Sequence, residues 1–166
     1  MMNTLGNTGT GKVVGRITGP AGVNANLGSL SAPDNLLAFP IDIGQIYSQN
    51  VAAELAERSS HIKYPSIYVY CEKIANTMTE KFRSFSGNMQ MAAEVRHSQD
   101  RLDGIQNALE LYVDSVTQVL DGGRGDWGDG FYYPGGYTVS LGAVKHGGRN
   151  FLQTAKIGFE IKVSID

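Results

Sequence analysis

The first residues that could do chemistry form the stretch Gly6–Lys12, GNTGTGK, which has the glycine, four residues, glycine, lysine spacing of a phosphate-binding loop. Such a loop wraps phosphates in backbone N–H groups at a helix N-terminus, and the next residue supplies a hydroxyl for magnesium. Val13 occupies that position. The chain before the loop is short for a buried strand, and Gly15, Gly19 and Pro20 disfavour a following helix. We therefore interpret the match as a coincidence in a glycine-rich arm.

The other ionisable residues give no catalytic, cofactor-binding or metal-binding set. Three histidines lie in different parts of the chain, none with a second ligand one helical turn away: His61, His97 and His146. Three aspartates near glycines lack the ligand spacing of a calcium loop: Asp121, Asp126 and Asp129. Cys71 is the single cysteine and lies among apolar residues, which favours a buried thiol over a nucleophile. We expect a protein that is not an enzyme and carries no cofactor.

Composition limits the remaining classes. The 166 residues are enough for one domain with a sizeable core and no stabilising disulfide or metal. The formal net charge is -2 and no segment is strongly basic, so the chain lacks the charge pattern of an autonomous nucleic-acid binder. No apolar run approaches the roughly 20 residues of a membrane span. We expect a soluble protein made in a reducing cytoplasm, without a membrane partner.

Glycine divides the chain. Seven of the 21 glycines fall between Gly6 and Gly28, and ten fall between Gly122 and Gly148. Glycine is costly within helices and strands. The sequence therefore predicts an extended, irregular N-terminal arm over residues 1–40 and a single α+β domain over residues 41–166.

Hydrophobic periodicity predicts the elements of that domain. A three- and four-residue apolar spacing indicates helices over residues 42–59 and 102–120. Alternation of apolar and polar residues indicates strands over 66–74, 89–95, 137–141 and 157–165. We expect the last two strands to pair antiparallel through a turn at His146–Gly148. The predicted fold is α+β, with two helices packed on a mainly antiparallel four-stranded sheet.

Four aromatic residues crowd the second glycine-rich region: Trp127, Phe131, Tyr132 and Tyr133. Tyrosine and tryptophan combine a large contact area with a polar tip, which suits protein interfaces. We predict a protein interface at these residues. The alternative is a small core folded against the main sheet.

Three segments from roughly Tyr64 to Asp166 carry a resemblance to a known family. They are FRSFSGNMQMAAEVRHSQDRLDGIQNALELYVDSVTQVL, the aromatic and glycine-rich WGDGFYYPGGYTVSL, and GAVKHGGRNFLQTAKIGFEIKVS. Their order and local features, including FSG before a strand and SQDR before the long helix, resemble tail terminator or tail completion proteins of long-tailed bacteriophages.

The resemblance implies a virion protein that forms a hexameric ring at the head-tail neck, ends the tail tube and presents a surface to the head connector. The implied partners are copies of itself, the tail tube protein, the head-completion or connector protein and the tail sheath. Genome DNA would cross the lumen without sequence-specific binding, and assembly would take place in the host cytoplasm. A head-completion or adaptor protein, a tail tube protein and, remotely, a nucleotide-binding packaging accessory are the alternatives.

Overall fold

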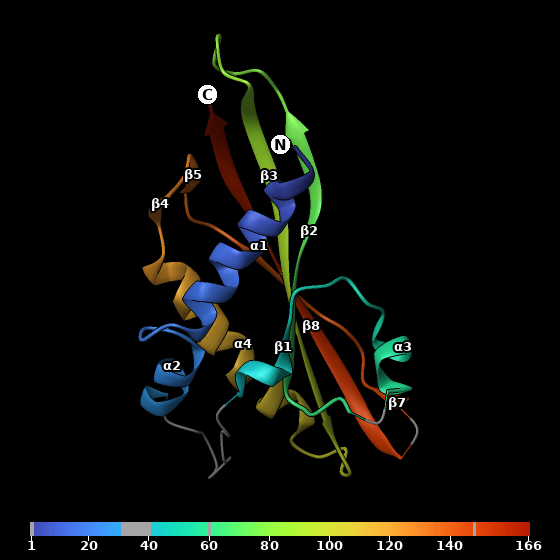
Figure 1. The fold of residues 1–166 in the computed structure, drawn as a ribbon. Helices are drawn as coiled ribbons and strands as arrows, with labels where there is room; N and C mark the ends of the chain where they lie inside the picture. Colours follow the sequence, from blue (N-terminus) through green and yellow to red (C-terminus); the bar gives the residue numbers. More distant parts are fainter. Residues whose placement is uncertain (1, 31–40, 60, 148) are drawn as a thin grey trace.

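Three long antiparallel strands form the centre of the fold. The computed structural model describes residues 2–30, 41–59, 61–147 and 149–166. Strand β3 (Phe85–Gln99) lies between β2 (Ser66–Asn76) and β8 (Asn150–Ile165) and pairs antiparallel with both. These strands run the length of the molecule, and the β2–β3 connection projects beyond the helices (Figure 1).

Short strands extend this centre into an eight-stranded sheet. Strand β1 (Ile46–Tyr47) pairs parallel with the start of β2. On the other side, β8 pairs in succession with β7 (Lys145–Gly147), β6 (Thr138–Leu141) and β5 (Phe131–Tyr133), all antiparallel. Strand β4 (Gly125–Gly128) pairs antiparallel with the outer side of β5.

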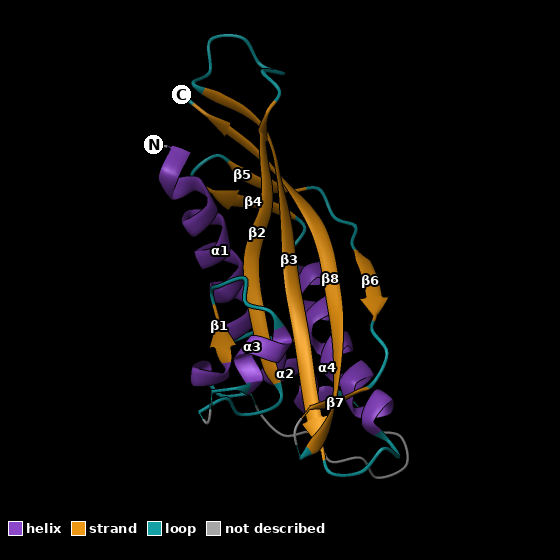
Figure 2. Ribbon diagram, turned by 90° about the vertical axis from the view of Figure 1, so that its right-hand side faces the viewer, coloured by secondary structure: helices purple, strands orange, loops and turns teal. Residues whose placement is uncertain are grey.

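Three helices cover one face of the sheet. Helix α4 (Ile105–Gly122) contacts β3 and β8, α1 (Met2–Thr18) contacts β2, and α2 (Val23–Ser29) packs on α4. Their apolar stripes join the inward residues of the long strands in one core, which includes Val13, Val69, Met91, Leu109 and Ile157. Figure 2 shows these helices beside the sheet, with α3 (Ala53–Glu57) near β1.

The opposite face of the sheet is covered only in part. Ala56 of α3 packs with Tyr68, Tyr70 and Ala92 in a second, smaller core. Beyond it this face is polar, and Gln90 donates a hydrogen bond to the Glu160 carboxylate at 2.6 Å. The two faces therefore differ in chemistry along the same three strands.

The structure confirms a mixed fold with helices on an antiparallel sheet and corrects its details. The helix expected at 102–120 is α4, and the four expected strands are β2, β3, β6 and β8, with β6 antiparallel to β8 as expected. The four-stranded, two-helix arrangement is wrong, because the described residues form an eight-stranded sheet and helices α1 and α2 are additional. Gly148 of the expected turn lies outside the described residues.

The irregular N-terminal arm is wrong as well. Residues 2–18 and 23–29 are helical and supply buried residues to the main core; residues 1 and 31–40 lie outside the described ranges. One stripe explains why α1 forms: Leu5, Gly9, Val13 and Ile17 recur every four residues and face the sheet. A Cβ on Gly9 would lie 2.7 Å from Cε of Met89, so glycine permits this close approach.

The single helix expected at 42–59 is also wrong. The chain forms a 3-10 turn at Ile43–Gln45, strand β1 and then the short helix α3. Pairing of Ile46 and Tyr47 with the edge of β2 replaces intrahelical hydrogen bonds there. A tertiary contact thus overrides the local helical periodicity.

Candidate functional site

Three of the four aromatic residues expected at an interface belong to the core. Trp127, Phe131 and Tyr133 are buried, whereas Tyr132 is 45% exposed. The Trp127 indole donates a hydrogen bond to the Gly123 carbonyl at 2.6 Å, and the Tyr133 hydroxyl donates one to the Gly136 carbonyl at 2.8 Å. The alternative of a small core packed against the sheet therefore describes three of these residues, and Tyr132 alone keeps the interface prediction.

Two cations of α1 lie against this aromatic cluster. The Lys12 ammonium donates hydrogen bonds to the Trp127 carbonyl and the Asp129 carboxylate, both at 2.9 Å, and lies 5.5 Å from the Phe131 ring centroid. The Arg16 guanidinium lies 4.6 Å from the Trp127 ring centroid. The GNTGTGK stretch therefore lies within helix α1, and its lysine contacts Trp127 and Asp129 of the same chain. The stretch lacks the geometry of a phosphate loop.

The remaining ionisable candidates stay apart. In the described part of the chain, no three His, Cys, Asp or Glu side chains meet as a metal site. His97 is half-buried against the Tyr112 ring, and burial lowers the pKa of its imidazole. Burial likewise raises the pKa of the Cys71 thiol, which disfavours the reactive thiolate.

A buried arginine, which the sequence did not reveal as such, organises the second core. Arg96 is 1% exposed; its guanidinium lies 3.9 Å from the Tyr68 ring centroid and pairs with the Glu94 carboxylate at 3.2 Å. It also donates a hydrogen bond to the Val51 carbonyl. Glu94 accepts a hydrogen bond from the Tyr70 hydroxyl, and desolvation, with this carboxylate, raises the pKa of Tyr70 to about 12. These contacts fasten the segment before β2 onto the sheet.

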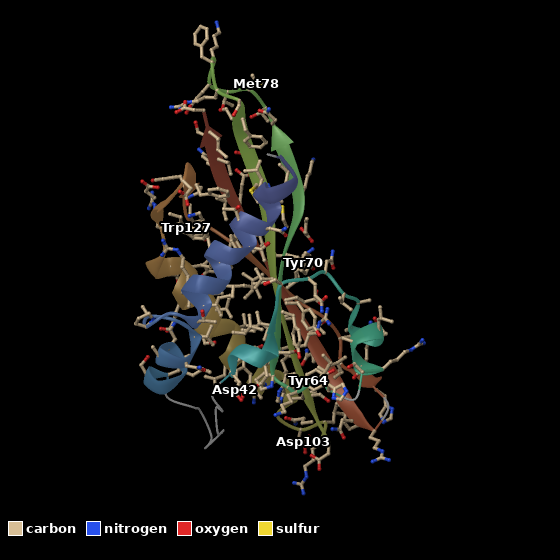
Figure 3. All side chains as sticks on the ribbon, in the orientation of Figure 1. Asp42, Tyr64, Tyr70, Met78, Asp103 and Trp127 are labelled. Atoms are coloured by element: carbon tan, nitrogen blue, oxygen red, sulfur yellow. The ribbon has the colours of Figure 1, made fainter. Side chains whose placement is uncertain are left out.

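The loop between β2 and β3 exposes two large apolar side chains. Phe82 is 100% exposed and Met78 is 54% exposed. Both have left-handed backbone conformations, with φ of 68° and 52°, which are unfavourable for residues with a Cβ. The loop stands at the far end of the long hairpin, where Figure 3 labels Met78.

Hydrogen bonds and ion pairs connect this loop to the ends of β3 and β8. The Ser86 hydroxyl bonds with the Thr79 hydroxyl at 2.6 Å and accepts from the Glu80 backbone N–H at 3.0 Å. The Ser164 hydroxyl donates to the Glu80 carboxylate at 2.6 Å, and Arg83 pairs with Glu80 and Asp166. The loop is therefore bonded to the sheet at its base, and its two apolar side chains project into solvent.

A second group of exposed apolar side chains lies along β6 and its approach. Tyr137, Val139 and Leu141 are exposed, and all four residues of β6 are exposed. Val139 and Leu141 lie on β6, which pairs only with β8 among the described elements, and Tyr137 directly precedes this strand. Among the described residues, exposed apolar side chains therefore gather at two separate places, the β2–β3 loop and strand β6.

Comparison with known proteins adds no relative to these features: no family model and no curated protein matches the chain. No helix among the described residues has the length and apolar character needed to cross a membrane.

Proposed function

We propose that this chain is a structural protein of a tailed-phage virion. It forms a ring at the head-tail neck, ends the tail tube and joins it to the head connector. The observation that carries the proposal is the β2–β3 tip, where a hydrogen-bonded loop presents Phe82 and Met78 beyond the body of the fold. The resemblance of residues from roughly Tyr64 to Asp166 to tail terminators supplies the identity of the assembly.

The tip has the properties of a protein-binding anchor. Burial of a large apolar side chain that projects from a surface favours binding, and this gain exceeds the cost of ordering one side chain. Aromatic anchors of this kind are frequent among the residues that dominate interfaces. In a ring, the tips of all copies repeat around the axis, and we propose that they contact the tail tube or the connector. Genome DNA would pass through the lumen.

Electron microscopy of the purified protein, with and without tail tubes, tests this function. We expect rings seated at one end of each tube. Phe82→Ser should reduce seating, because loss of a central anchor costs at least about 2 kcal/mol, which is roughly a 30-fold weaker affinity. Leu55→Ser is the matched control, since Leu55 is exposed on α3, away from the tip.

Several outcomes discriminate among functions. A monomer that never joins a tube would contradict the proposal. Rings that bind only the head connector would identify a head-completion or adaptor protein, and tubes that grow without limit would identify a tail tube protein. Normal seating by Phe82→Ser would remove the tip from the docking surface.

A further inference from the structure

Among the described residues, strand β6 and most of β2 form unpaired parts of the two opposite edges of the sheet. Strand β6 pairs with β8 along one side and with no described strand along the other. Strand β2 pairs with β1 only at Ile67 and Tyr68, so no described strand pairs with its outer edge from Val69 to Asn76. Open edges present unpaired backbone N–H and C=O groups, and natural proteins commonly protect them with charges or proline. Strand β6 carries neither, and it adds exposed Val139 and Leu141.

A groove runs along the open part of β2. It has a volume of about 480 Å³ and is bounded by β2 on one side, by α1 on another and by the segment after β1. Its β2 wall consists of Tyr70, Cys71, Glu72, Lys73 and Ile74, with a β-bulge between Cys71 and Lys73, and its α1 wall consists of the small residues Gly6, Asn7 and Thr10. Small side chains leave room for an additional strand beside β2.

The directions of the two edges are complementary. Strand β2 is antiparallel to β3, β3 to β8, and β8 to β6, so β2 and β6 run in opposite directions. A neighbouring copy with the same orientation would therefore place its β6 antiparallel to β2. Antiparallel pairing is the stronger of the two ladder geometries.

The two edges also present matching faces. Val139 is paired with Ile157 of β8, and Leu141 with Ala155, both of which face the helix-covered core. Cys71 and Ile74 of β2 pack against that same core. If the sheet continues from one copy to the next, the exposed apolar side chains of β6 fall beside Cys71 and Ile74, next to α1.

We propose that strand β6 of one copy occupies the groove along β2 of the next copy, which forms a head-to-tail interface with a continuous sheet. This inference rests on the proposed function, because it names the surfaces through which the subunits of the ring meet. A heterologous contact of this type builds rings when its rotation closes.

Register sets a stagger between neighbouring copies. The pairings across the sheet place Thr138 of β6 level with Tyr70 of β2. Because β1 occupies the edge of β2 below Val69, the incoming β6 must pair above that level, so each copy is displaced along the strands relative to its neighbour. Closed sheets require such a stagger between strands.

The native Cys71 makes the interface testable by disulfide cross-linking. Cysteine introduced by Val139→Cys or Leu141→Cys faces the same side of the sheet as Cys71, and opposed residues in antiparallel strands have Cα separations within the range of a disulfide. Oxidation by copper phenanthroline and oxygen at alkaline pH should yield covalent dimers and a ladder of larger species up to the complete ring. Leu102→Cys, at an exposed residue outside both edges, is the control and should give no ladder.

A Cys71→Ser background decides the partner of β6. We expect the ladder to disappear in Val139→Cys/Cys71→Ser and in the matching Leu141 variant. Cross-links that persist would show that β6 pairs with β6 across a twofold axis and would overturn the inference. If the wild-type protein forms rings but neither cysteine variant cross-links, the inference is wrong, although the proposed ring is retained. A wild-type monomer that joins no tube would overturn both this inference and the proposed function.

Complementation of two assembly variants provides a second, independent test. Val139→Lys/Leu141→Lys disables β6, and Asn7→Trp/Asn50→Trp fills the groove; all four side chains are exposed, so folding should be retained, which thermal melting checks. Each variant alone should be monomeric by multi-angle light scattering. Their mixture should form one-to-one dimers and nothing larger, because only one intact β6 and one intact groove remain. Rings formed by either variant alone would contradict the interface.

Discussion

Replacement of Val13 by alanine tests whether the glycine-rich N-terminal helix belongs to the core. Val13 is 2% exposed within α1, and the change removes two methyl groups. Their transfer costs about 1.6 kcal/mol, and the cavity that they leave adds to this cost. Alanine recovers up to about 0.7 kcal/mol through its higher helix propensity. We expect the free energy of unfolding to fall by about 1.5–2 kcal/mol and the melting temperature by roughly 3–8 °C.

Val14→Ala is the matched control, because it makes the same substitution at the next position of the same helix. Val14 is only partly buried, so the gain in helix propensity should offset most of the lost packing. Urea titration of both variants gives the difference between their free energies of unfolding, in which the equal effects of helix propensity cancel. Equal losses at the two positions would refute the packing of α1 on the sheet through its stripe. An irregular arm, as the composition suggested, predicts no loss at either.

Three further predictions address other elements. A Cβ on Gly87 would lie 1.9 Å from the Ala75 carbonyl oxygen, so Gly87→Ala should destabilise the β2–β3 pair by roughly 1–3 kcal/mol in urea titration. Gly11 has open space around it, so Gly11→Ala should stabilise α1 by roughly 0.5–1 kcal/mol in the same assay. Burial lowers the pKa of His97 in the folded protein, so the unfolded state binds its proton more readily; stability should fall as pH decreases below about 6.5, less steeply in His97→Gln. Because Lys12 is engaged within the chain, ATP with magnesium should leave the melting temperature unchanged, while Lys12→Ala should lower it; a saturable shift with ATP would contradict this assignment.

Strong periodicity was sufficient to predict the centre of the fold. The alternation that runs from Ile157 to Ile165 and the apolar stripe of α4 each persist over several turns or strand residues, so local pattern and tertiary structure agree. The strands nevertheless extend further than predicted: β8 begins at Asn150 and β3 at Phe85. Pairing with neighbours maintains these extensions where the alternation weakens.

Helix propensity alone does not predict α1, because the segment is rich in glycine. Gly6 and Gly9 are costly in an isolated helix, but they lie at the contact with β2 and β3, where Cβ atoms would approach Cys71 and Met89. The four-residue spacing of Leu5, Gly9, Val13 and Ile17 was the available signal. It becomes visible only when glycine is counted as a residue that permits close packing as well as one that breaks helices.

Burial of Arg96 could not be predicted from its own strand. The alternation of β3 places Arg96 on the same side as Glu94, which is the polar side in sequence. Its burial results from a remote segment, since Val51 accepts its hydrogen bond and Tyr47 stacks on Tyr68 with a centroid separation of 4.7 Å. The periodicity of that segment predicts a helix, whereas the pairing of β1 with β2 is what places it over this face.

Residue type was a weaker guide to an interface than strand position. The aromatic residues Trp127, Phe131 and Tyr133 suggested a surface because glycines surround them, yet the alternation in Phe131–Tyr133 buries the first and third and exposes the second. The apolar residues that stay exposed, Val139 and Leu141, are ordinary aliphatic residues on an uncharged strand edge. A core strand buries such residues against its own chain. Here, burial of these two side chains requires a further strand beside β6. The groove along β2 of another copy has room for β6, runs antiparallel to it and continues the same face of the sheet.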